Sequence, residues 1–248
     1  MRIIISPAKK MNTDTDSLEA MNLPVFLNDA EKLMHCIQSM TFAEAQELWK
    51  CNEKLTQLNY DRFSCMNLRN VLTPAILSYE GLQYQHMAPK VFTSDALEYI
   101  EEHLRILSGF YGVLRPLDGI TPYRLEMQAK LAVDGCLDLY EYWGERLHRE
   151  VTEGNRDRII INLASKEYAS CVEKYIGQDD RFITVEFGEL VNGKVKQKGT
   201  FAKMARGEMV RFIAERKVTD VEQLEEFCAM NLRFRAELSE WNRFVFTV

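Results

Sequence analysis

The sequence predicts an α/β fold of the mixed α+β type, in which a single domain over residues 1–248 holds a mixed β-sheet flanked by helices. Three observations predict it. Met1–Ile5 and Arg158–Leu163 are short runs rich in β-branched residues, which is typical of buried strands. Segments with helical periodicity separate these runs along the chain. Asn192-Gly193 stands between two alternating segments, and this dipeptide strongly favours a β-hairpin.

In the first half of the chain, the predicted strand at Met1–Ile5 ends at Ser6-Pro7, because proline cannot extend a hydrogen-bonded ladder. Thr41 and Glu44 have the spacing of a capping box, which predicts the start of a helix. Glycine at Ser108-Gly109 permits the left-handed conformation that ends a helix. The other elements expected here are a loop over 12–23, helices over 28–68 and 93–107, and a short strand over 76–83.

The second half of the chain alternates in the same way. Arg158–Leu163 is apolar enough for a buried strand, and the segments beside Asn192-Gly193 alternate between apolar and polar residues. Thr219 and Glu222 repeat the capping-box spacing. The other elements expected here are helices over 137–151, 166–175 and 201–217, a hairpin over 181–200, and a strand over 243–248 at the sheet edge.

Composition limits the class of protein. With 248 residues, of which 46% are hydrophobic, the chain is long enough for a full core. It has no run of about 18 apolar residues, so we expect no membrane span. The apolar stretch at the start is too short for a signal peptide, and we expect a cytoplasmic protein. Six cysteines are scattered singly without a CxxC pair, which predicts reduced thiols rather than a disulfide framework.

Residues 194–217 form a basic segment in an acidic chain. The formal net charge of the whole chain is −6. This segment carries eight cations and two acids, a net charge of +6, so the remaining residues sum to −12. A local reversal of this size points to an anionic partner, with phosphate as the leading candidate. The acidic remainder discourages self-association and favours a monomer.

The predicted helix over 201–217 admits two interpretations. A helical wheel places Lys203 and Arg206 together on one flank of the apolar stripe. A solvated helix explains cations near its C-terminus, where the dipole favours them, but it explains these two near the N-terminus badly unless an anion lies nearby. The preceding strand presents three lysines on one face, and these would line the same cleft if strand and helix pack closely: Lys194, Lys196 and Lys198.

The glycine turn at Leu107–Arg115 predicts a helix-hairpin-helix-like element, whose backbone N–H groups at Gly109 and Gly112 would bind phosphate. The match is loose, because two residues separate the glycines where one is usual. Arg115, Tyr123 and Arg124 follow closely, and such residues suit bidentate phosphate binding and stacking on a base or sugar. The alternative is a helix cap and a turn, with Arg115 in an internal salt bridge.

Ser6-Pro-Ala-Lys9 places a hydroxyl and a lysine at the carboxyl end of the first predicted strand. In open α/β sheets, ligands bind at that edge. The spacing lacks the glycines of a P-loop. The alternative interpretation is a capped turn with exposed lysines.

Other chemical constellations are missing. Glu145 and His148 have the ExxH spacing, but a di-iron site needs two such units and two further glutamates, and no other histidine has a glutamate three residues before it. We find no HExxH, no GxSxG and no nucleophile paired with a base. We therefore expect no metal site and no cofactor.

Four motifs resemble those of the YaaA family of bacterial peroxide-stress proteins, and they follow in order through nearly the whole chain. They are SPAKKM, the block His103–Met127, NLASKEY (Asn162–Tyr168) and FAKMARGEMVRFI (Phe201–Ile213). The stretch Leu107–Met127 is the most specific part. The sequence departs from the usual pattern at Lys10-Met11 and after Phe227, outside the central blocks.

The resemblance implies a cytosolic bacterial protein that helps cells survive hydrogen peroxide and helps limit free iron. It also implies sequence-independent DNA binding through phosphate contacts in a positively charged cleft, with the helix-hairpin-helix-like element at Leu107–Arg115. The positions that it places in the cleft are Ser6, Lys9, Tyr123, Arg124, Asn162, Ser165, Tyr168, Lys203 and Arg206.

The expected function is therefore a DNA-binding protein that helps limit iron-dependent oxidative damage. The alternative is an enzyme that acts on a nucleotide or a nucleic-acid lesion in the same cleft, for example by N-glycosidic cleavage. In that case Tyr123-Arg124-Leu-Glu126 would supply an acid/base and a phosphate clamp. Direct iron chelation is disfavoured, because clusters of ligands are missing from the sequence.

Overall fold

A mixed β-sheet of eight strands runs through the protein, and the computed structural model describes all residues from 1 to 248. The strands of this sheet are β1 (Arg2–Ile5), β5 (Leu104–Ser108), β6 (Gly112–Leu114), β8 (Ile159–Leu163), β9 (Arg181–Val191), β10 (Lys194–Lys196), β11 (Arg233–Phe234) and β12 (Arg243–Thr247). Their order is β11-β12-β9-β8-β1-β5-β6, and β10 pairs with β9 outside that path. Two small two-stranded sheets pair β2 (Lys10–Met11) with β4 (Tyr79–Glu80) and β3 (Thr73–Pro74) with β7 (Gly119–Ile120).

The five central strands β5, β1, β8, β9 and β12 are parallel, whereas β6, β10 and β11 join them in antiparallel fashion. Counted along the chain, the parallel strands have the spatial order 2-1-3-4-5. The first strand therefore lies inside the sheet, and Ile3, Ile4 and Ile5 are fully buried. The strand order reverses between β1 and β8, and in open α/β sheets such a reversal leaves a crevice at the carboxyl ends of the strands.

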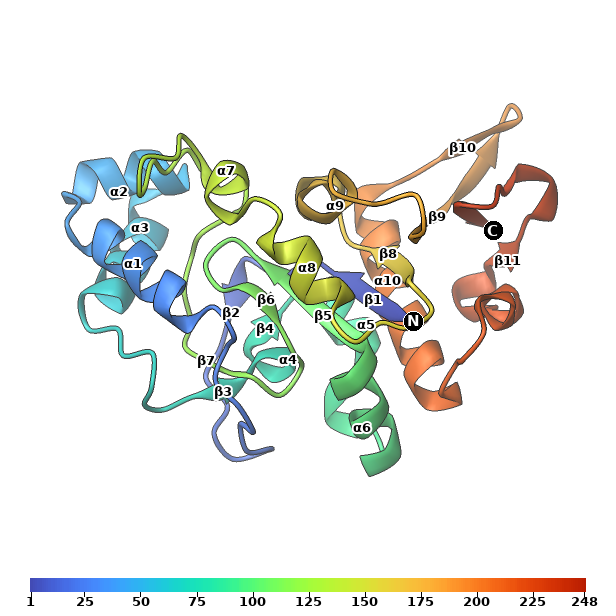
Figure 1. Cartoon of the computed structure of the whole chain (residues 1–248), viewed down its shortest axis with the longest axis horizontal. Helices are drawn as coiled ribbons and strands as arrows, with labels where there is room; N and C mark the ends of the chain where they lie inside the picture. The colour runs from blue at the N-terminus through green and yellow to red at the C-terminus, as the bar shows by residue number, and fades with distance from the viewer.

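Ten α-helices flank the sheet. They are α1 (Leu27–Gln38), α2 (Phe42–Trp49), α3 (Glu53–Ser64), α4 (Ala75–Ser78), α5 (Leu82–Met87), α6 (Ser94–His103), α7 (Leu139–Trp143), α8 (Arg146–Thr152), α9 (Lys166–Glu173) and α10 (Gly199–Arg216). Short 3₁₀ helices occupy Pro89–Val91, Val221–Glu226, Ala229–Asn231 and Ala236–Leu238. In Figure 1, α8 and α5 appear on either side of β1, and α1 to α3 gather at one end of the molecule. One hydrophobic core joins these layers, so the chain forms a single α/β domain.

Several local predictions are confirmed. Thr41 caps α2 with the complete capping box, and Asn192-Gly193 turns between β9 and β10. The strand after Arg158, the helix that follows it and the basic helix lie where the sequence predicts them. Each of these elements has a strong signal within a few residues, which is why its position could be predicted from the sequence.

The predicted helix-hairpin-helix-like element is wrong. The helix predicted over 93–107 ends at His103, and Leu104–Ser108 forms β5, which pairs with β1 and with β6. Leu107–Arg115 is therefore a strand, a buried turn and a second strand. Leu97, Ile100, Leu104 and Leu107 fit one face of a helix, but the apolar run Leu104–Leu107 also suits a fully buried strand. Because Leu104–Ser108 pairs with β1, it forms a strand rather than the end of a helix.

Other boundaries differ for similar reasons. The region 28–68 holds three helices, and Gly144, with a φ of 51°, separates α7 from α8 within 137–151. Residues 76–83 are mostly helical rather than a strand. The final strand β12 lies one place in from the sheet edge, because β11 pairs outside it. The second capping box joins Asp220 to Gln223 and opens a 3₁₀ helix.

A close crossing of α5 and α10 holds the basic helix against the rest of the protein. A Cβ at Gly207 would clash with the Gln83 carbonyl oxygen and lie 2.9 Å from the Met87 nitrogen. His86 Nδ1 and Glu208 Oε1 join the two helices at 2.8 Å. Glycine at 207 therefore sets how near the cations of α10 come to α5.

We expect Gly207→Ala to destabilise the protein by about 1–3 kcal/mol, because the added methyl group forces two backbones apart. Urea denaturation measures the effect. Gly199→Ala, at the open first turn of the same helix with no atom within 4 Å of the added Cβ, is the control and should change stability by less than about 1 kcal/mol. Equal effects of the two substitutions would contradict the close crossing.

Candidate functional site

A pocket of about 390 Å³ opens at the carboxyl ends of β1 and β8, where the strand order reverses. Segments far apart in the sequence line it: the turn after β1, the start of α5, residues 123–126, the start of α9, and the N-terminal half of α10. We call it the cationic pocket. Eight of the residues predicted for the cleft line it: Ser6, Lys9, Tyr123, Arg124, Ser165, Tyr168, Lys203 and Arg206.

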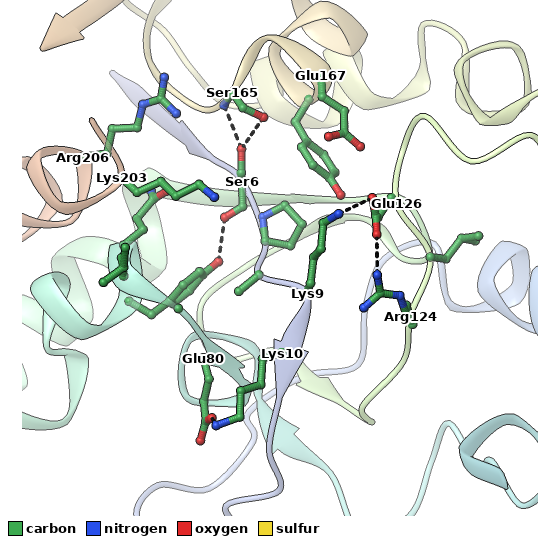
Figure 2. A pocket seen from close by; sticks show the side chains of 18 of the residues that line it. Ser6, Lys9, Lys10, Glu80, Arg124, Glu126, Ser165, Glu167, Lys203 and Arg206 are labelled. Atoms are coloured by element: carbon green, nitrogen blue, oxygen red, sulfur yellow. Dashed lines mark hydrogen bonds and ion pairs between the residues drawn. The ribbon is translucent and has the colours of Figure 1, made fainter. Parts of the chain in front are cut away.

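Ser6 and Ser165 join the two strand ends beneath the pocket (Figure 2). The Ser165 N–H donates to Ser6 Oγ at 2.8 Å, and Ser6 Oγ donates to Ser165 Oγ at 3.2 Å. The Tyr84 hydroxyl donates to the Ser6 carbonyl oxygen at 3.0 Å. These bonds hold the turn after β1 against the start of α9, and they leave the Ser165 hydroxyl proton without an acceptor. No base contacts either hydroxyl, so neither serine is arranged as an activated nucleophile.

One wall of the pocket is an ion triad around Glu126. Lys9 Nζ lies 2.7 Å from Glu126 Oε2, and Arg124 Nη2 lies 3.1 Å from Glu126 Oε1. Lys10 pairs with Glu80 nearby. Each carboxylate of this wall therefore has a cation of its own, and the triad retains one net positive charge.

The facing wall carries Lys203 and Arg206, which lie on the opposite side of Ser6 from Glu126 in Figure 2. Neither forms an ion pair. The Arg206 side chain is half-buried, and its buried Nε–H has no hydrogen-bond partner. Burial lowers the pKa of Arg206, since no anion offsets the loss of water. A partly buried guanidinium without a counter-ion costs stability, and an anionic ligand would relieve that cost.

Glu167 is the third carboxylate of the pocket and has no ion pair. Its Oε1 accepts a hydrogen bond from the Gln128 N–H at 3.3 Å. Burial raises the pKa of Glu167, and the nearby Glu126 carboxylate raises it further against the opposing effect of Lys9. Glu126 and Glu167 therefore share the cavity in different environments: two cations hold Glu126, and none pairs with Glu167. Two carboxyl groups whose environments differ in this way are found in acid–base sites.

Buried tyrosines form the back of the pocket. The Tyr123 hydroxyl lies 2.6 Å from Ser108 Oγ and 2.8 Å from the Tyr79 hydroxyl. Burial raises the pKa of Tyr123 to about 12, so its phenol stays neutral near pH 7. Tyr168 is buried too, and burial raises its pKa well above the ordinary value. These rings supply apolar surface and fixed hydroxyls rather than proton transfer.

The charges of the lining sum to a positive value in an acidic protein. Five cations face three carboxylates, which leaves a net charge of +2 at pH 7. A small concave site with this balance favours an anion, and its volume suits one nucleotide-sized group.

Asn162 does not line the pocket, although the family resemblance placed it there. It lies in β8, where its side chain donates to Thr184 Oγ1 at 3.2 Å and accepts from the Ala164 N–H at 2.9 Å. Asn162 therefore shapes the turn between β8 and α9, which in turn places Ser165.

Gly109 and Gly112 are buried by packing and cannot meet a phosphate. A Cβ at Gly109 would lie 2.6 Å from the Leu125 carbonyl oxygen, so this turn supports the backbone of the pocket wall from behind. Gly112 has a φ of 74°, and Trp143 packs against it. The expectation that this turn binds phosphate is wrong.

The three lysines beside the Asn-Gly turn also lie outside the cationic pocket. Lys198 pairs with Glu189 at 2.7 Å, and the hairpin of β9 and β10 projects from the body of the protein in Figure 1. The predicted convergence with Lys203 and Arg206 is therefore wrong for Lys194, Lys196 and Lys198.

Several residues that line the cationic pocket were not predicted from the sequence as site residues. Gln83 ends the segment 76–83 that was predicted as a strand, Tyr84 follows it directly, and no local pattern identified either as a site residue. Glu126 was expected as part of the enzyme alternative or as a salt-bridge partner of Arg115, and not as a residue that holds Lys9 and Arg124. Glu167 lies within NLASKEY, and its place in the first helical turn after a buried strand is a signal that could have identified it.

No group of three or more His, Cys, Asp or Glu side chains is placed to hold a metal ion. None of the helices combines the length and apolar character needed to cross a membrane.

Comparisons with known proteins cover nearly the whole chain. A family model described as peroxide stress protein YaaA matches residues 1–238. A UPF0246 protein of Desulfitobacterium hafniense (strain Y51) is 52% identical, over 99% of this chain and 97% of that protein. A UPF0246 protein of Pediococcus pentosaceus is 50% identical over 99% and 97%, and one of Lactiplantibacillus plantarum is 50% identical over 99% and 98%.

Arg115 lies away from the cationic pocket, beside a buried carboxyl. It lines a separate cavity with Asp118 and Glu150. Its side chain forms no ion pair, and only its backbone N–H donates to Asp118 Oδ2, at 2.8 Å. Both interpretations of Arg115, phosphate contact in the cleft and internal salt bridge, are therefore wrong. Burial raises the pKa of Asp118 to about 7.

This raised pKa predicts a pH-dependent loss of stability. In the unfolded chain Asp ionises near pH 4, whereas in the folded protein the Asp118 carboxyl keeps its proton up to about pH 7. Between these pH values ionisation favours the unfolded chain, so the free energy of unfolding falls as the pH rises from 4 to 7. Relative to the wild type, Asp118→Asn should gain up to about 4 kcal/mol of unfolding free energy between pH 4 and pH 7.5. Urea denaturation across that range measures the difference. Asp179→Asn, at an exposed position, is the control. A difference between Asp118→Asn and wild type that does not change with pH would contradict the raised pKa of Asp118.

Proposed function

The chain belongs to the peroxide stress protein YaaA family, and from this premise we propose that it protects bacteria from peroxide by binding DNA non-specifically through the cationic pocket. In this proposal the protein acts in the cytoplasm. It helps limit iron-dependent oxidative damage by occupying DNA rather than by chelating iron itself.

The observation that carries the proposal is the pair of cations without partners. Lys203 and Arg206 line one wall of a concave site, and neither has a counter-ion. Phosphate suits them because a guanidinium donates two parallel hydrogen bonds to its oxygens and an ammonium adds a point charge. Contacts of this kind to phosphate oxygens carry no sequence information, which supports sequence-independent binding.

The shape of the pocket refines the proposal. A cavity of about 390 Å³ accepts one nucleotide-sized group, whereas a duplex presents only its backbone to such an opening. Buried Tyr123 and Tyr168 line the interior and offer ring surface to a base or sugar. We therefore propose that a single phosphate-bearing nucleotide of the bound strand enters the pocket.

Charge reversal at the unpaired cations should abolish DNA binding. We expect Lys203→Glu with Arg206→Glu to raise Kd by at least about 100-fold at low salt, because phosphate contacts dominate the affinity. Fluorescence anisotropy with labelled DNA measures it. For the wild type, log Kd should rise with log salt by about 0.9 per duplex phosphate neutralised, or about 0.7 for a single strand.

Lys194→Glu with Lys196→Glu is the matched control, since it makes the same charge change on the projecting hairpin. It should keep wild-type affinity. Because Arg206 is half-buried, thermal unfolding checks the fold of the first double variant, and Lys203→Gln with Arg206→Gln provides a milder pair. Unaltered binding in a folded pocket variant would refute the placement.

A second candidate, an enzyme in the same pocket, is favoured by one observation. Glu167 lies in the pocket with a raised pKa and no cation partner, while Glu126 beside it is held by Lys9 and Arg124. We propose that Glu167 acts as a general acid on a nucleotide or a nucleic-acid lesion, for example in N-glycosidic cleavage. Its proton would pass to the departing base as the bond between sugar and base breaks. Water would then add its oxygen to the sugar carbon and return one proton to the Glu167 carboxylate.

The catalytic role predicts that Glu167→Gln loses release of free base from a lesion-bearing oligonucleotide but still binds it. Chromatography of the released base and anisotropy together measure the two effects. Wild-type release should fall as the pH rises through the pKa of Glu167, because the acid loses its proton. Glu173→Gln, on the exposed face of the same helix, should release base normally. Equal release by Glu167→Gln and wild type would eliminate this role.

A further inference from the structure

A second cavity adjoins the cationic pocket across Glu126. It measures about 310 Å³ and lies between the C-terminal end of α2 and the segment 126–130. Glu126 lines both cavities. Gln128 lines the second cavity, and its N–H donates to Glu167 of the first. The two cavities are thus adjacent, and the Glu126 side chain lies between them.

The second cavity is also cationic. Lys50 and Lys130 line it, and neither forms an ion pair. The carboxylate it contains belongs to Glu126, which Lys9 and Arg124 already neutralise from the other side. No free negative charge therefore opposes these two lysines.

An unpartnered buried donor also lies in this wall. Trp49 lines the second cavity and is 4% exposed, and its Nε1–H is buried without a hydrogen-bond partner. The indole ring stacks on Phe63, with ring centroids 5.7 Å apart, which fixes its orientation. Trp49 therefore contributes a fixed aromatic side chain to this wall, whose surroundings change when a ligand fills the cavity.

We propose that this cavity is a second nucleotide subsite, and that the ligand of the protein is a single-stranded segment that spans Glu126 with at least two nucleotides. The inference rests on the proposed function of the cationic pocket. One phosphate lies against Lys203 and Arg206, and the next nucleotide lies beyond Glu126, with its phosphate against Lys50 and Lys130. A groove of successive cations with aromatic side chains is a common way to bind single strands.

A duplex does not satisfy this arrangement. The two cavities, one on each side of Glu126, each accept one nucleotide. In a duplex the bases are paired and stacked inside the double helix and cannot enter them. The second subsite therefore narrows the substrate class from DNA in general to single-stranded nucleic acid, whether a free strand, an end or a locally opened region.

The test compares ligands of different length. Thymidine 5′-monophosphate, the 5′-phosphorylated dinucleotide pTpT, an eight-residue oligo-dT and a blunt duplex compete against a labelled oligo-dT in fluorescence anisotropy. We expect pTpT to bind at least about tenfold more tightly than the mononucleotide, because the second contact becomes intramolecular. The eight-residue strand should bind more tightly than the duplex.

Lys50→Ala with Lys130→Ala should remove the advantage of pTpT and leave the mononucleotide affinity unchanged. Both lysines are exposed, so the variant should fold normally. Lys54→Ala is the matched control, because Lys54 is an exposed, unpaired lysine on the neighbouring helix α3 that lines neither cavity. Binding of pTpT, but not of the mononucleotide, should also change tryptophan emission, and Trp49→Phe should abolish that change.

The outcomes separate the two proposals. Equal affinity for mononucleotide and pTpT, or a full pTpT advantage in the double lysine variant, would overturn the second subsite and leave the cationic pocket intact. Tighter binding of the duplex would overturn the single-strand preference. No binding of any of these ligands would overturn both proposals.

Discussion

Parallel pairing of β1 with β8 is the constraint on which the site depends. The two strands run side by side from Arg2 and Ile160 to Ile5 and Leu163, so their carboxyl ends finish at the same level. Because the strand order reverses here, the connecting segments diverge and leave a concave edge. Ser6 and Ser165 then join the two ends by hydrogen bonds, and every other wall of the pocket is arranged around that junction.

Charge pairing explains how an acidic protein maintains a positive cavity. Elsewhere the hairpin lysine Lys198 and the helix-terminal Lys217 meet carboxylates, so their charges are locally cancelled. Inside the pocket the ion-paired carboxylates are held by other cations, which leaves Lys203 and Arg206 free. Low-dielectric walls strengthen the field of such unpaired charges. The same logic extends across Glu126, where two more lysines have no counter-ion.

The position of Arg206 lowers the stability of the fold, and close packing around the pocket holds it there. Arg206 places a guanidinium against the core without an anion, which is unfavourable in the absence of ligand. Gly207, one residue later, lets α10 approach the backbone of α5 closely, and Gly109 supports the opposite wall from behind. Unsatisfied polar groups held in place by tight packing are typical of functional sites rather than of ordinary cores.

The sequence by itself determined the α/β class, the first strand, the capped helix at Thr41, the Asn-Gly hairpin and the basic helix. Each depends on a signal within a few residues, and the motifs also identified eight residues of one pocket. Only the tertiary structure decided that Leu104–Ser108 is a strand, that the glycine turn is buried, and that Glu126 and Glu167 face the cations while the hairpin lysines do not. Periodicity, caps and turns depend on neighbours along the chain. Strand pairing and the choice of ion partner depend on contacts between residues far apart in sequence, and no local pattern encodes them.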